Sequence, residues 1–454
     1  MSNEPIIISA KDCLPFKNTD GHEEAIEAFL KQSDQFEKFH FSDKQSDSDT
    51  PELAYFDSKN GWTAGRMVGE ARFNHKGADY KIIVRPRFGE VQLFRMLSEI
   101  FNVRFTETKS EYDTSKDEQV LIKRLISFFW LNLLAKGNRY GLPRISKEEE
   151  YYGDRIRGRL KVRDSLISMK TEGKVYSAFK QKSLNETIAK LLKLSHQILE
   201  SKYFLSEIHQ PQNASYAIQK INAFHSRNMW VTRQEYQEVQ YKEIYKTYKP
   251  VIDLSWAIIQ NENIRGKDEG NVSPVSYFID MAEIWELYVK SLLKKELGKT
   301  GWQLISNEYQ TYNSSVLKRK LIPDVVFKKG KQLIVFDGKY KMMKGRKEDI
   351  DRADYFQIHT YIHYLAQKYN VSIGGLIYPF SVPLDPKMEN ETRSHSLFSQ
   401  GFSGTKYCVD GIDLSFLNGK ISDDQVEQEF EEVEQDFVNR INHLLSNQSI
   451  RKIA

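Results

Sequence analysis

LIPDVVFKKGKQLIVFDGKYK, residues 321–341, contains two short strand signals from which our prediction of the fold starts. Val325–Phe327 and Leu333–Phe336 are runs of β-branched and aromatic residues, which are typical of buried strands. The basic segment Lys328-Lys329-Gly330-Lys331 forms the turn between the two runs. The sequence therefore predicts a β-hairpin.

Acidic residues stand at the ends of both predicted strands. Asp324 opens the first strand behind a proline, and Asp337 closes the second, followed after one residue by Lys339. Alternate side chains of a strand share a face, so Asp337 and Lys339 project the same way, and Gly338 leaves its carbonyl approachable. If the hairpin brings Asp324 alongside, two carboxylates and an ammonium group converge on one spot.

This set of groups suits a magnesium site for phosphodiester hydrolysis. Two carboxylates and a lysine are costly to bury together without a compensating ion. Mg²⁺ takes oxygen ligands and keeps several waters, so Asp324, Asp337 and the Gly338 carbonyl could supply the protein ligands. Lys339 would orient or help deprotonate the attacking water and offset charge on phosphorus. A salt bridge on an edge strand is the structural alternative.

Neighbouring helices offer further candidates. A third carboxylate ligand could come from Glu286 or Glu283, which lie three residues apart on the predicted preceding helix, although either could be a solvated helix residue. Gln357 and Tyr361 lie four apart on the predicted following helix, where an amide and a phenol could contact a base or a phosphate. Ordinary helix surface is the alternative for this pair.

The context of the aspartates matters, because an acid, a spacer and a lysine also occur elsewhere, for example at Asp57/Lys59 and Asp385/Lys387. Eleven Lys and Arg residues lie between positions 318 and 347, where the two predicted site aspartates are the only acids. The whole chain is nearly balanced, with 66 Lys+Arg against 62 Asp+Glu. A basic field around two isolated carboxylates suits a phosphodiester site. Lys328 and Lys329 in the turn are candidate contacts for the DNA backbone beside the metal; a solvated turn is the alternative.

Composition indicates an ordinary globular protein. The chain has 454 residues, 40% of them hydrophobic, so it can bury a large core and should divide into two or three domains. We find no apolar run of membrane-spanning length and no signal peptide. The only cysteines, Cys13 and Cys408, cannot form a disulfide framework or a cysteine-based zinc site. These features predict a cytoplasmic protein.

The pattern along the chain predicts a mixed α/β protein with three domains. A small β-rich domain is expected over residues 1–105, on the strength of a hairpin signal between Trp62–Phe73 and Tyr80–Val84. Residues 106–265 are expected to form a mainly helical domain, and residues 266–454 a sheet flanked by helices.

Further elements are predicted from periodicity and turn signals. Within these domains we expect helices at residues 91–101, 117–135, 184–199, 273–297, 353–368 and 426–444, with further helical segments over 213–260. Strands are expected at 302–305 and 371–380. Loops are expected at 42–50, at 342–352 and in the Glu/Tyr-rich segment before Gly153, and a domain boundary at 261–272.

Nucleotide binding by this chain is not expected. Gly298-Lys299-Thr300 imitates the end of a phosphate-binding P-loop, but Leu293 stands where the first glycine belongs, and the preceding sequence is helical. We predict that the chain itself binds no nucleoside triphosphate.

Several motifs in a fixed order give a resemblance to a known family. Pro323-Asp324, Asp337-Gly338-Lys339 and Gln357-x-x-x-Tyr361 resemble the PD-(D/E)xK nuclease superfamily in its RecB-like form. A narrower resemblance, to McrC, the nuclease subunit of McrBC modification-dependent restriction systems, rests on further segments at residues 82–88, 158–160, 184–187, 284–289, 339–341 and 374–379.

The resemblance implies a division of labour. McrC-like subunits carry the nuclease and dock on a hexameric AAA+ GTPase, McrB, which recognises and translocates DNA and whose hydrolysis they stimulate. For this chain it implies a C-terminal PD-(D/E)xK sheet, docking through the N-terminal domain, and double-stranded DNA cleaved with Mg²⁺, or with Mn²⁺ as a substitute. Gln357, Tyr361 and Lys341 would support the site or bind DNA, and two complexes would pair for double-strand cleavage.

Two other functions stay open at this point. One is a stand-alone RecB-like nuclease that needs no motor. The other is a non-catalytic activator that docks on the motor and keeps the nuclease fold only as structure.

Overall fold

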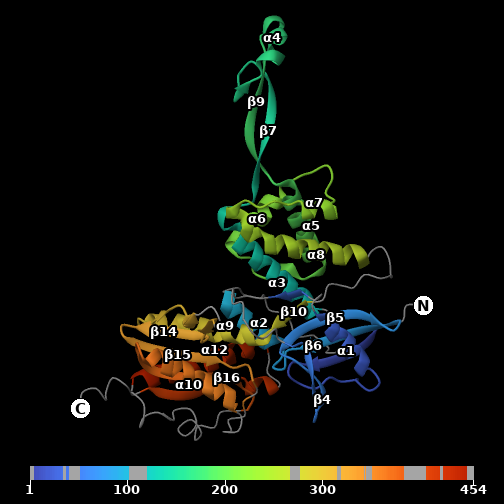
Figure 1. Ribbon diagram of the computed structural model, residues 1–454. Helices are drawn as coiled ribbons and strands as arrows, with labels where there is room; N and C mark the ends of the chain where they lie inside the picture. Colours follow the sequence, from blue (N-terminus) through green and yellow to red (C-terminus); the bar gives the residue numbers. More distant parts are fainter. Residues whose placement is uncertain are drawn as a thin grey trace. The chain divides into compact units, whose positions relative to one another are not determined.

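A computed structural model describes residues 5–33, 37–39, 52–101, 120–265, 277–313, 318–341, 343, 350–382, 405–419 and 423–446. The chain forms two compact units (Figure 1). The first unit joins residues 1–114 to residues 273–454, and the second unit holds residues 115–272. The expected N-terminal and C-terminal domains thus belong to one unit, and the mixed α/β character is confirmed.

The N-terminal sheet of the first unit has five strands in the order β1-β6-β5-β10-β2. The predicted hairpin is confirmed, because β5 and β6 pair antiparallel and turn at Lys76-Gly77, both of which have positive φ as tight hairpin turns require. Helix α1 packs on this sheet, with Phe29 buried against Phe73 and Phe278. The bounds are β1 Ile6–Lys11, β2 Glu37–Phe39, β5 Met67–His75, β6 Ala78–Arg85, β10 Tyr277–Asp280 and α1 Glu23–Lys31, with the small hairpin β3 Ala54–Asp57 and β4 Gly61–Ala64 beside them.

Strand β10 corrects the prediction of a helix over residues 273–297. Residues 277–280 are buried in the N-terminal sheet, where they pair antiparallel with β5, and the helix begins only at Met281. The aromatic and β-branched side chains of this run favour a strand with both faces covered. Asp280 stays extended and caps the helix, because its carboxylate accepts a 2.9 Å hydrogen bond from the Ala282 amide.

The C-terminal sheet has five strands in the order β11-β14-β15-β16-β17. The predicted hairpin forms its centre, with β14 and β15 antiparallel, and helix α10 connects β15 to the parallel strand β16. Helix α9 packs on β15 and α12 on β17 (Figure 1). The bounds are β11 Gln303–Leu304, β14 Val325–Lys329, β15 Gln332–Gly338, β16 Asn370–Phe380, β17 Lys406–Asp413, α9 Met281–Lys299, α10 Arg352–Ala366 and α12 Asp423–Ser446, with the two-stranded sheet β12 Tyr309–Asn313 and β13 Lys318–Leu321 beside them.

Contacts between helices α2 (Glu90–Phe101), α9 and α12 join the N-terminal and C-terminal parts of the first unit. Helix α2 packs against α9, and Ser291 of α9 donates a 3.2 Å hydrogen bond to the Glu99 carbonyl. Arg95 of α2 donates to both oxygens of Glu434 on α12, at 2.8 and 2.6 Å.

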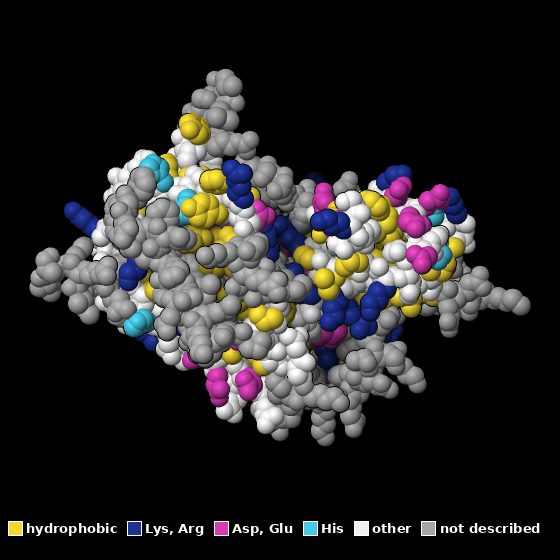
Figure 2. Space-filling view, turned by 90° about the horizontal axis from the view of Figure 1, so that it is seen from below, with side chains coloured by type: hydrophobic (Ala, Val, Ile, Leu, Met, Phe, Trp, Pro, Cys, Tyr) yellow, Lys and Arg dark blue, Asp and Glu magenta, His cyan; other side chains and the backbone are white. Residues whose placement is uncertain are grey.

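On the face shown in Figure 2, Lys and Arg side chains gather near the middle.

Helices form the body of the second unit, as predicted. The central helix α3 is apolar on most sides and fully buries Phe128, Trp130 and Leu131. Trp130 donates a 2.8 Å hydrogen bond to Ser255 Oγ on α8. The bounds are α3 Val120–Gly137, α5 Glu186–Lys202, α6 Gln212–Asn222, α7 Arg233–Gln237 and α8 Lys249–Arg265, so the boundary predicted to begin at residue 261 instead starts inside a helix.

A projecting β-arm departs from the prediction of a mainly helical domain (Figure 1). The Glu/Tyr-rich segment expected to be a loop is strand β7, Arg144–Gly153, which pairs with β9, Val175–Leu184, over ten residues. The arm also carries β8, Arg159–Leu160, and helix α4, Val162–Thr171. Much of β7 is exposed, so its sequence lacks the apolar alternation that marks a half-buried strand.

Other expectations have mixed outcomes. The helices predicted at 91–101, 184–199, 353–368 and 426–444 are confirmed within a few residues by α2, α5, α10 and α12. The loop predicted at residues 42–50 and most of that at 342–352 lie outside the described residues. Among the described residues, no helix is long and apolar enough to cross a membrane.

Candidate active site

The hairpin brings Asp324 and Asp337 together, as the sequence predicted. Val325 lies opposite Phe336 in the antiparallel register, so the residues that flank this pair, Asp324 and Asp337, come next to each other. The Gly338 amide donates a 2.8 Å hydrogen bond to Asp324 Oδ2. Asp337 is 1% exposed and Asp324 is 9% exposed, so both carboxylates sit out of bulk water.

Burial and charge oppose each other at Asp337. Burial, together with the neighbouring Asp324 carboxylate, raises the pKa of Asp337 from 3.8 to about 7, and the Lys339 ammonium acts against this rise. Lys339 Nζ lies 2.6 Å from Asp337 Oδ2. Burial alone would lower the pKa of Lys339, but the Asp337 and Asp354 carboxylates outweigh it and raise that pKa. Lys339 is therefore held as a cation.

Lys339 is positioned by the predicted glutamine and tyrosine. Its ammonium donates a 2.8 Å hydrogen bond to Gln357 Oε1 on α10. Gln357 Nε2 in turn donates to the Tyr361 hydroxyl at 2.9 Å. Tyr361 is buried, and burial raises its pKa to about 12, so the phenol keeps its proton. The four-residue spacing on one helix thus forms a chain of hydrogen bonds that ends on the lysine.

Asp354 is a member of the cluster that the sequence analysis missed. Its carboxylate is 5% exposed, lies 3.7 Å from Lys339 Nζ, and accepts a 2.7 Å hydrogen bond from Lys341. The Tyr378 hydroxyl donates to it at 3.4 Å. A signal was present, because Asp351 caps α10 and an acid three residues later falls in the first turn of the helix, facing the sheet. Lys341, a predicted supporting residue, joins the site through Asp354.

Glu286 lies beside the site. Helix α9 packs so closely on β15 that a Cβ added to Gly338 would lie 3.5 Å from Glu286 Cα and 3.6 Å from its Cγ. Trp285 fixes this approach with a 3.1 Å hydrogen bond from Nε1 to the Ile377 carbonyl. The described residues contain no group of three His, Cys, Asp or Glu side chains that could hold a metal ion, so the structure does not bring Glu286 or Glu283 into such a group with the two aspartates. A third carboxylate ligand from α9 stays a prediction.

The basic turn does not lie beside the two aspartates, contrary to the prediction. Lys328 and Lys329 are at the opposite end of β14 from Asp324, and four residues of strand span about 13 Å. Lys329 donates a 2.8 Å hydrogen bond to the Thr300 carbonyl, and Lys328 Nζ lies 5.3 Å from the centre of the Tyr369 ring. The role of both lysines in DNA binding remains a prediction.

The oxygen atoms of the site fit a hard divalent cation. Within the described residues, Asp337 Oδ2 accepts no hydrogen bond of ordinary geometry, although it is buried. A second buried carboxylate lies next to it, and burial, with repulsion from this neighbouring charge, raises the pKa of Asp337. Mg²⁺ bound by Asp324, Asp337 and the Gly338 carbonyl would relieve that repulsion. The donors are therefore of the kind that magnesium prefers.

The sequence of the chain is similar to a known protein family over much of its length. A sequence profile of the family described as "McrBC 5-methylcytosine restriction system component" matches residues 63–379. A search of curated proteins gave no match.

A solved structure shares the fold of this chain. The first match is a chain of a refined half-complex from a tetradecameric assembly of Thermococcus gammatolerans McrB AAA+ hexamers with bound McrC. It is 12% identical, with a TM-score of 0.51, and the match covers 97% of this chain and 100% of that one. A cryo-EM structure of the Thermococcus gammatolerans McrBC complex matches at 12% identity over 65% of this chain and 88% of that one, with a TM-score of 0.32. Because the profile spans well over half of the sequence, the chain belongs to the McrBC 5-methylcytosine restriction system component family.

Proposed function

We propose that this protein is the Mg²⁺-dependent DNA endonuclease subunit of a McrBC-like restriction system, acting in the cytoplasm against foreign DNA. The observation that carries the proposal is the buried pair of Asp324 and Asp337 with the Lys339 ammonium 2.6 Å from Asp337. A structural ion pair needs only one carboxylate for one lysine. Here a second carboxylate adds repulsion, which a divalent cation would offset.

The C-terminal sheet is proposed to be of the PD-(D/E)xK type. Asp324 precedes β14, while Asp337 and Lys339 follow one another along β15 and its extension, and α10 supplies Gln357. The proposed catalytic groups therefore lie where these two central strands of the mixed sheet begin and end, and on the helix beside them, rather than on long loops.

Each residue has a distinct role in the proposed reaction. Asp324, Asp337 and the Gly338 carbonyl would hold Mg²⁺, or Mn²⁺ in its place, and Glu286 would complete the set. The bound ion would lower the pKa of a coordinated water and polarise the phosphate. Lys339, held as a cation by its neighbours, would orient the attacking water and stabilise charge on the phosphate oxygens. Gln357 and Tyr361 would keep that ammonium in place.

A motor partner is part of the proposal. The structural relative was solved with its McrC bound to AAA+ hexamers of McrB. We propose that this chain likewise docks on an AAA+ GTPase hexamer, stimulates its hydrolysis and cleaves the double-stranded DNA that the motor handles. We propose the N-terminal sheet as one docking surface. The arm is a second candidate, because α4 exposes Leu166, Ile167 and Met169. Pairing of complexes, as in that tetradecameric assembly, would supply two active sites for double-strand cleavage.

DNA cleavage by the reconstituted complex tests the proposal. The chain is combined with a McrB-type AAA+ GTPase, GTP, Mg²⁺ and DNA carrying 5-methylcytosine. The wild type should cut, Asp337→Asn should show no cutting, and Lys339→Met should lose at least about a hundredfold in rate. Asp436→Asn and Lys294→Met, which remove the same charges at exposed helix positions, should cut like the wild type. Equal cutting by all four variants would refute this active site.

The same experiment separates the alternatives. Cutting without the motor and GTP would favour a stand-alone RecB-like nuclease. Restriction in cells that survives the Asp324→Asn/Asp337→Asn double substitution would favour a non-catalytic activator of the motor.

A further inference from the structure

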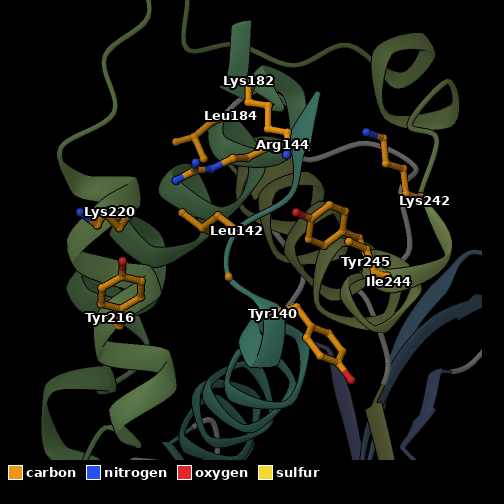
Figure 3. A pocket seen from close by; sticks show the side chains of 11 residues that line it. Tyr140, Leu142, Arg144, Lys182, Leu184, Tyr216, Lys220, Lys242, Ile244 and Tyr245 are labelled. Atoms are coloured by element: carbon orange, nitrogen blue, oxygen red, sulfur yellow. The ribbon is translucent and has the colours of Figure 1, made fainter. Parts of the chain in front are cut away.

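The second unit contains a cavity of about 400 Å³ at the base of the β-arm. The ends of β7 and β9 form one side of it, α6 forms another, and the 3₁₀ turn over Glu243–Tyr248 forms a third (Figure 3). Leu142 and Leu184 supply apolar lining. This cavity plays no part in the candidate active site, whose residues all belong to the first unit.

Four cationic side chains line the cavity: Arg144, Lys182, Lys220 and Lys242. Among the described residues that line it there is no Asp or Glu, although the whole chain has nearly equal numbers of acids and bases. The acid next to Lys242 in sequence, Glu243, is paired with Lys246. Among the described residues, none of these four cations has a carboxylate partner, so their like charges repel one another and the cavity favours an anion.

Tyrosines accompany the cations. Tyr216 of α6 is 53% exposed and Tyr140 is 61% exposed, while Tyr245 is partly buried. Lys220 Nζ lies 5.5 Å from the centre of the Tyr216 ring. In Figure 3, Arg144 extends toward the helix that carries Tyr216, and the Tyr245 hydroxyl points into the same region from the other side, whereas Tyr140 turns away. The cavity thus combines exposed aromatic rings with cations that lack carboxylate partners among the described residues, a combination that suits an aromatic, anionic ligand.

We propose that this cavity binds a nucleoside phosphate unit, with the phosphate among Arg144, Lys182 and Lys242 and the base against the Tyr216 ring. Guanidinium and ammonium groups supply the donors that phosphate oxygens accept. Aromatic faces stack on bases of any sequence. A volume of about 400 Å³ lies within the usual range for sites that hold one small ligand.

The unit could belong to a nucleic-acid strand or be a free nucleotide. The cavity is open, and its cations come from β7, β9, α6 and the residue before the 3₁₀ turn, an arrangement that suits a backbone passing through. An acidic peptide would use the cations but would leave the tyrosine ring without a function. The nucleic-acid strand is therefore the favoured source.

Fluorescence anisotropy with the full chain tests the proposal. The probes are a short labelled single-stranded oligonucleotide and a fluorescent GTP analogue, each measured in EDTA so that metal bound by the two aspartates cannot contribute. Lys182→Glu/Lys242→Glu should weaken oligonucleotide binding at least about tenfold and should reduce the slope of log K against log salt by about 1.4. Lys170→Glu, a reversal at an exposed position on α4, should have little effect.

Tyr216→Ala and Tyr216→Phe separate stacking from simple charge. The alanine variant should weaken binding about tenfold, and the phenylalanine variant should bind like the wild type. Binding of the oligonucleotide supports a strand, and binding of the GTP analogue alone assigns the cavity to a free nucleotide. If the charge-reversal variant binds both probes like the wild type, or if polyglutamate competes as well as unlabelled oligonucleotide and Tyr216→Ala has no effect, the proposal is overturned.

This test is independent of the proposed cleavage. Asp337→Asn should abolish cutting and leave oligonucleotide binding in EDTA unchanged. If the cavity proposal is wrong, the cavity variants bind the oligonucleotide like the wild type. If the nuclease assignment is wrong, Asp337→Asn cuts DNA like the wild type.

Discussion

Arg87 donates a 2.8 Å hydrogen bond to the carbonyl oxygen of Tyr340, the residue that follows Lys339 in the chain. Its guanidinium lies 4.2 Å from the centre of the Tyr340 ring, and Arg87 Nε lies 3.5 Å from Asp12 Oδ2. The Arg87 and Asp12 side chains are almost completely buried. Burial raises the pKa of Asp12 to about 6 against the opposing charge of Arg87. Asp12, directly after β1, and Arg87, just after β6, thus fix the segment after β15 that carries the proposed catalytic lysine.

Removing the Arg87 guanidinium should destabilise the first unit strongly. Arg87→Met leaves the Asp12 carboxylate buried without its cation, a change that typically costs about 3–5 kcal/mol. We expect a lower midpoint of urea unfolding and, because Lys339 adjoins Tyr340, slower DNA cleavage under conditions where the variant is folded. Adding Asp12→Asn should restore part of the stability. Arg163→Met, at an exposed position on α4, is the control, and an unchanged midpoint for Arg87→Met would contradict the role assigned to this contact.

Stability should fall with rising pH because of Asp337. Its pKa is about 7 in the folded protein and 3.8 ordinarily, so the folded state keeps a proton that the unfolded state has lost. The contribution to stability is therefore full below about pH 4, declines up to about pH 7 and is constant above it. Relative to Asp337→Asn, the metal-free wild type should lose roughly 3 kcal/mol between pH 5 and pH 8.

Denaturant unfolding of both proteins in EDTA at these two pH values measures that difference. Asp12 also has a raised pKa, but it is present in both proteins and cancels in the comparison. Mg²⁺ competes with the same proton, so the increase in melting temperature on adding Mg²⁺ should be larger at pH 8 than at pH 5. A stability difference between the two proteins that does not vary with pH would exclude the raised pKa.

Local sequence predicted the core of the site well. The strands of the hairpin are short apolar runs, and their antiparallel register alone brings Asp324 to Asp337. Helical spacing placed Gln357 and Tyr361 on one face, and the structure joins both to Lys339. The location of the basic turn was predicted incorrectly. A turn and the free ends of its hairpin lie at opposite ends of the strands, so strand length by itself separates the two.

Contacts between distant segments could not be predicted. Arg87 and Tyr340 are 253 positions apart, and neither carries a local signal of the other. Strand β10 shows the same limit, because its four residues pair with β5 across the entire second unit of the sequence. Strand β7 was missed for another reason. Both of its faces are largely exposed, so its partner strand rather than apolar periodicity determines its conformation.

Loss of the Gln357 amide should slow catalysis without unfolding the protein. Gln357→Leu removes the acceptor that holds Lys339 and the donor to Tyr361, and the side chain is exposed on α10. We expect kcat for DNA cleavage to fall about tenfold, with little change in KM, because the ammonium loses its orientation. Gln357→Glu retains an acceptor and should recover most of the rate. His363→Leu, an exposed position on the same helix, should cut normally; equal rates for Gln357→Leu and the wild type would remove this residue from the site.

Two glycines of the sheet should respond differently to the same substitution. A Cβ on Gly375 would lie 2.2 Å from the Cys408 carbonyl oxygen in the neighbouring strand, so Gly375→Ala should lower the melting temperature markedly. A Cβ on Gly338 would meet Glu286 and Trp285 at 3.5 Å, which is ordinary contact, so Gly338→Ala should melt like the wild type. If the Gly338 carbonyl binds Mg²⁺ beside the scissile phosphate, the methyl group should nevertheless crowd the site and reduce DNA cleavage. Wild-type cleavage by a stable Gly338→Ala protein would show that metal and substrate access do not require a glycine here, which would contradict the predicted crowding; the backbone carbonyl is present in both proteins.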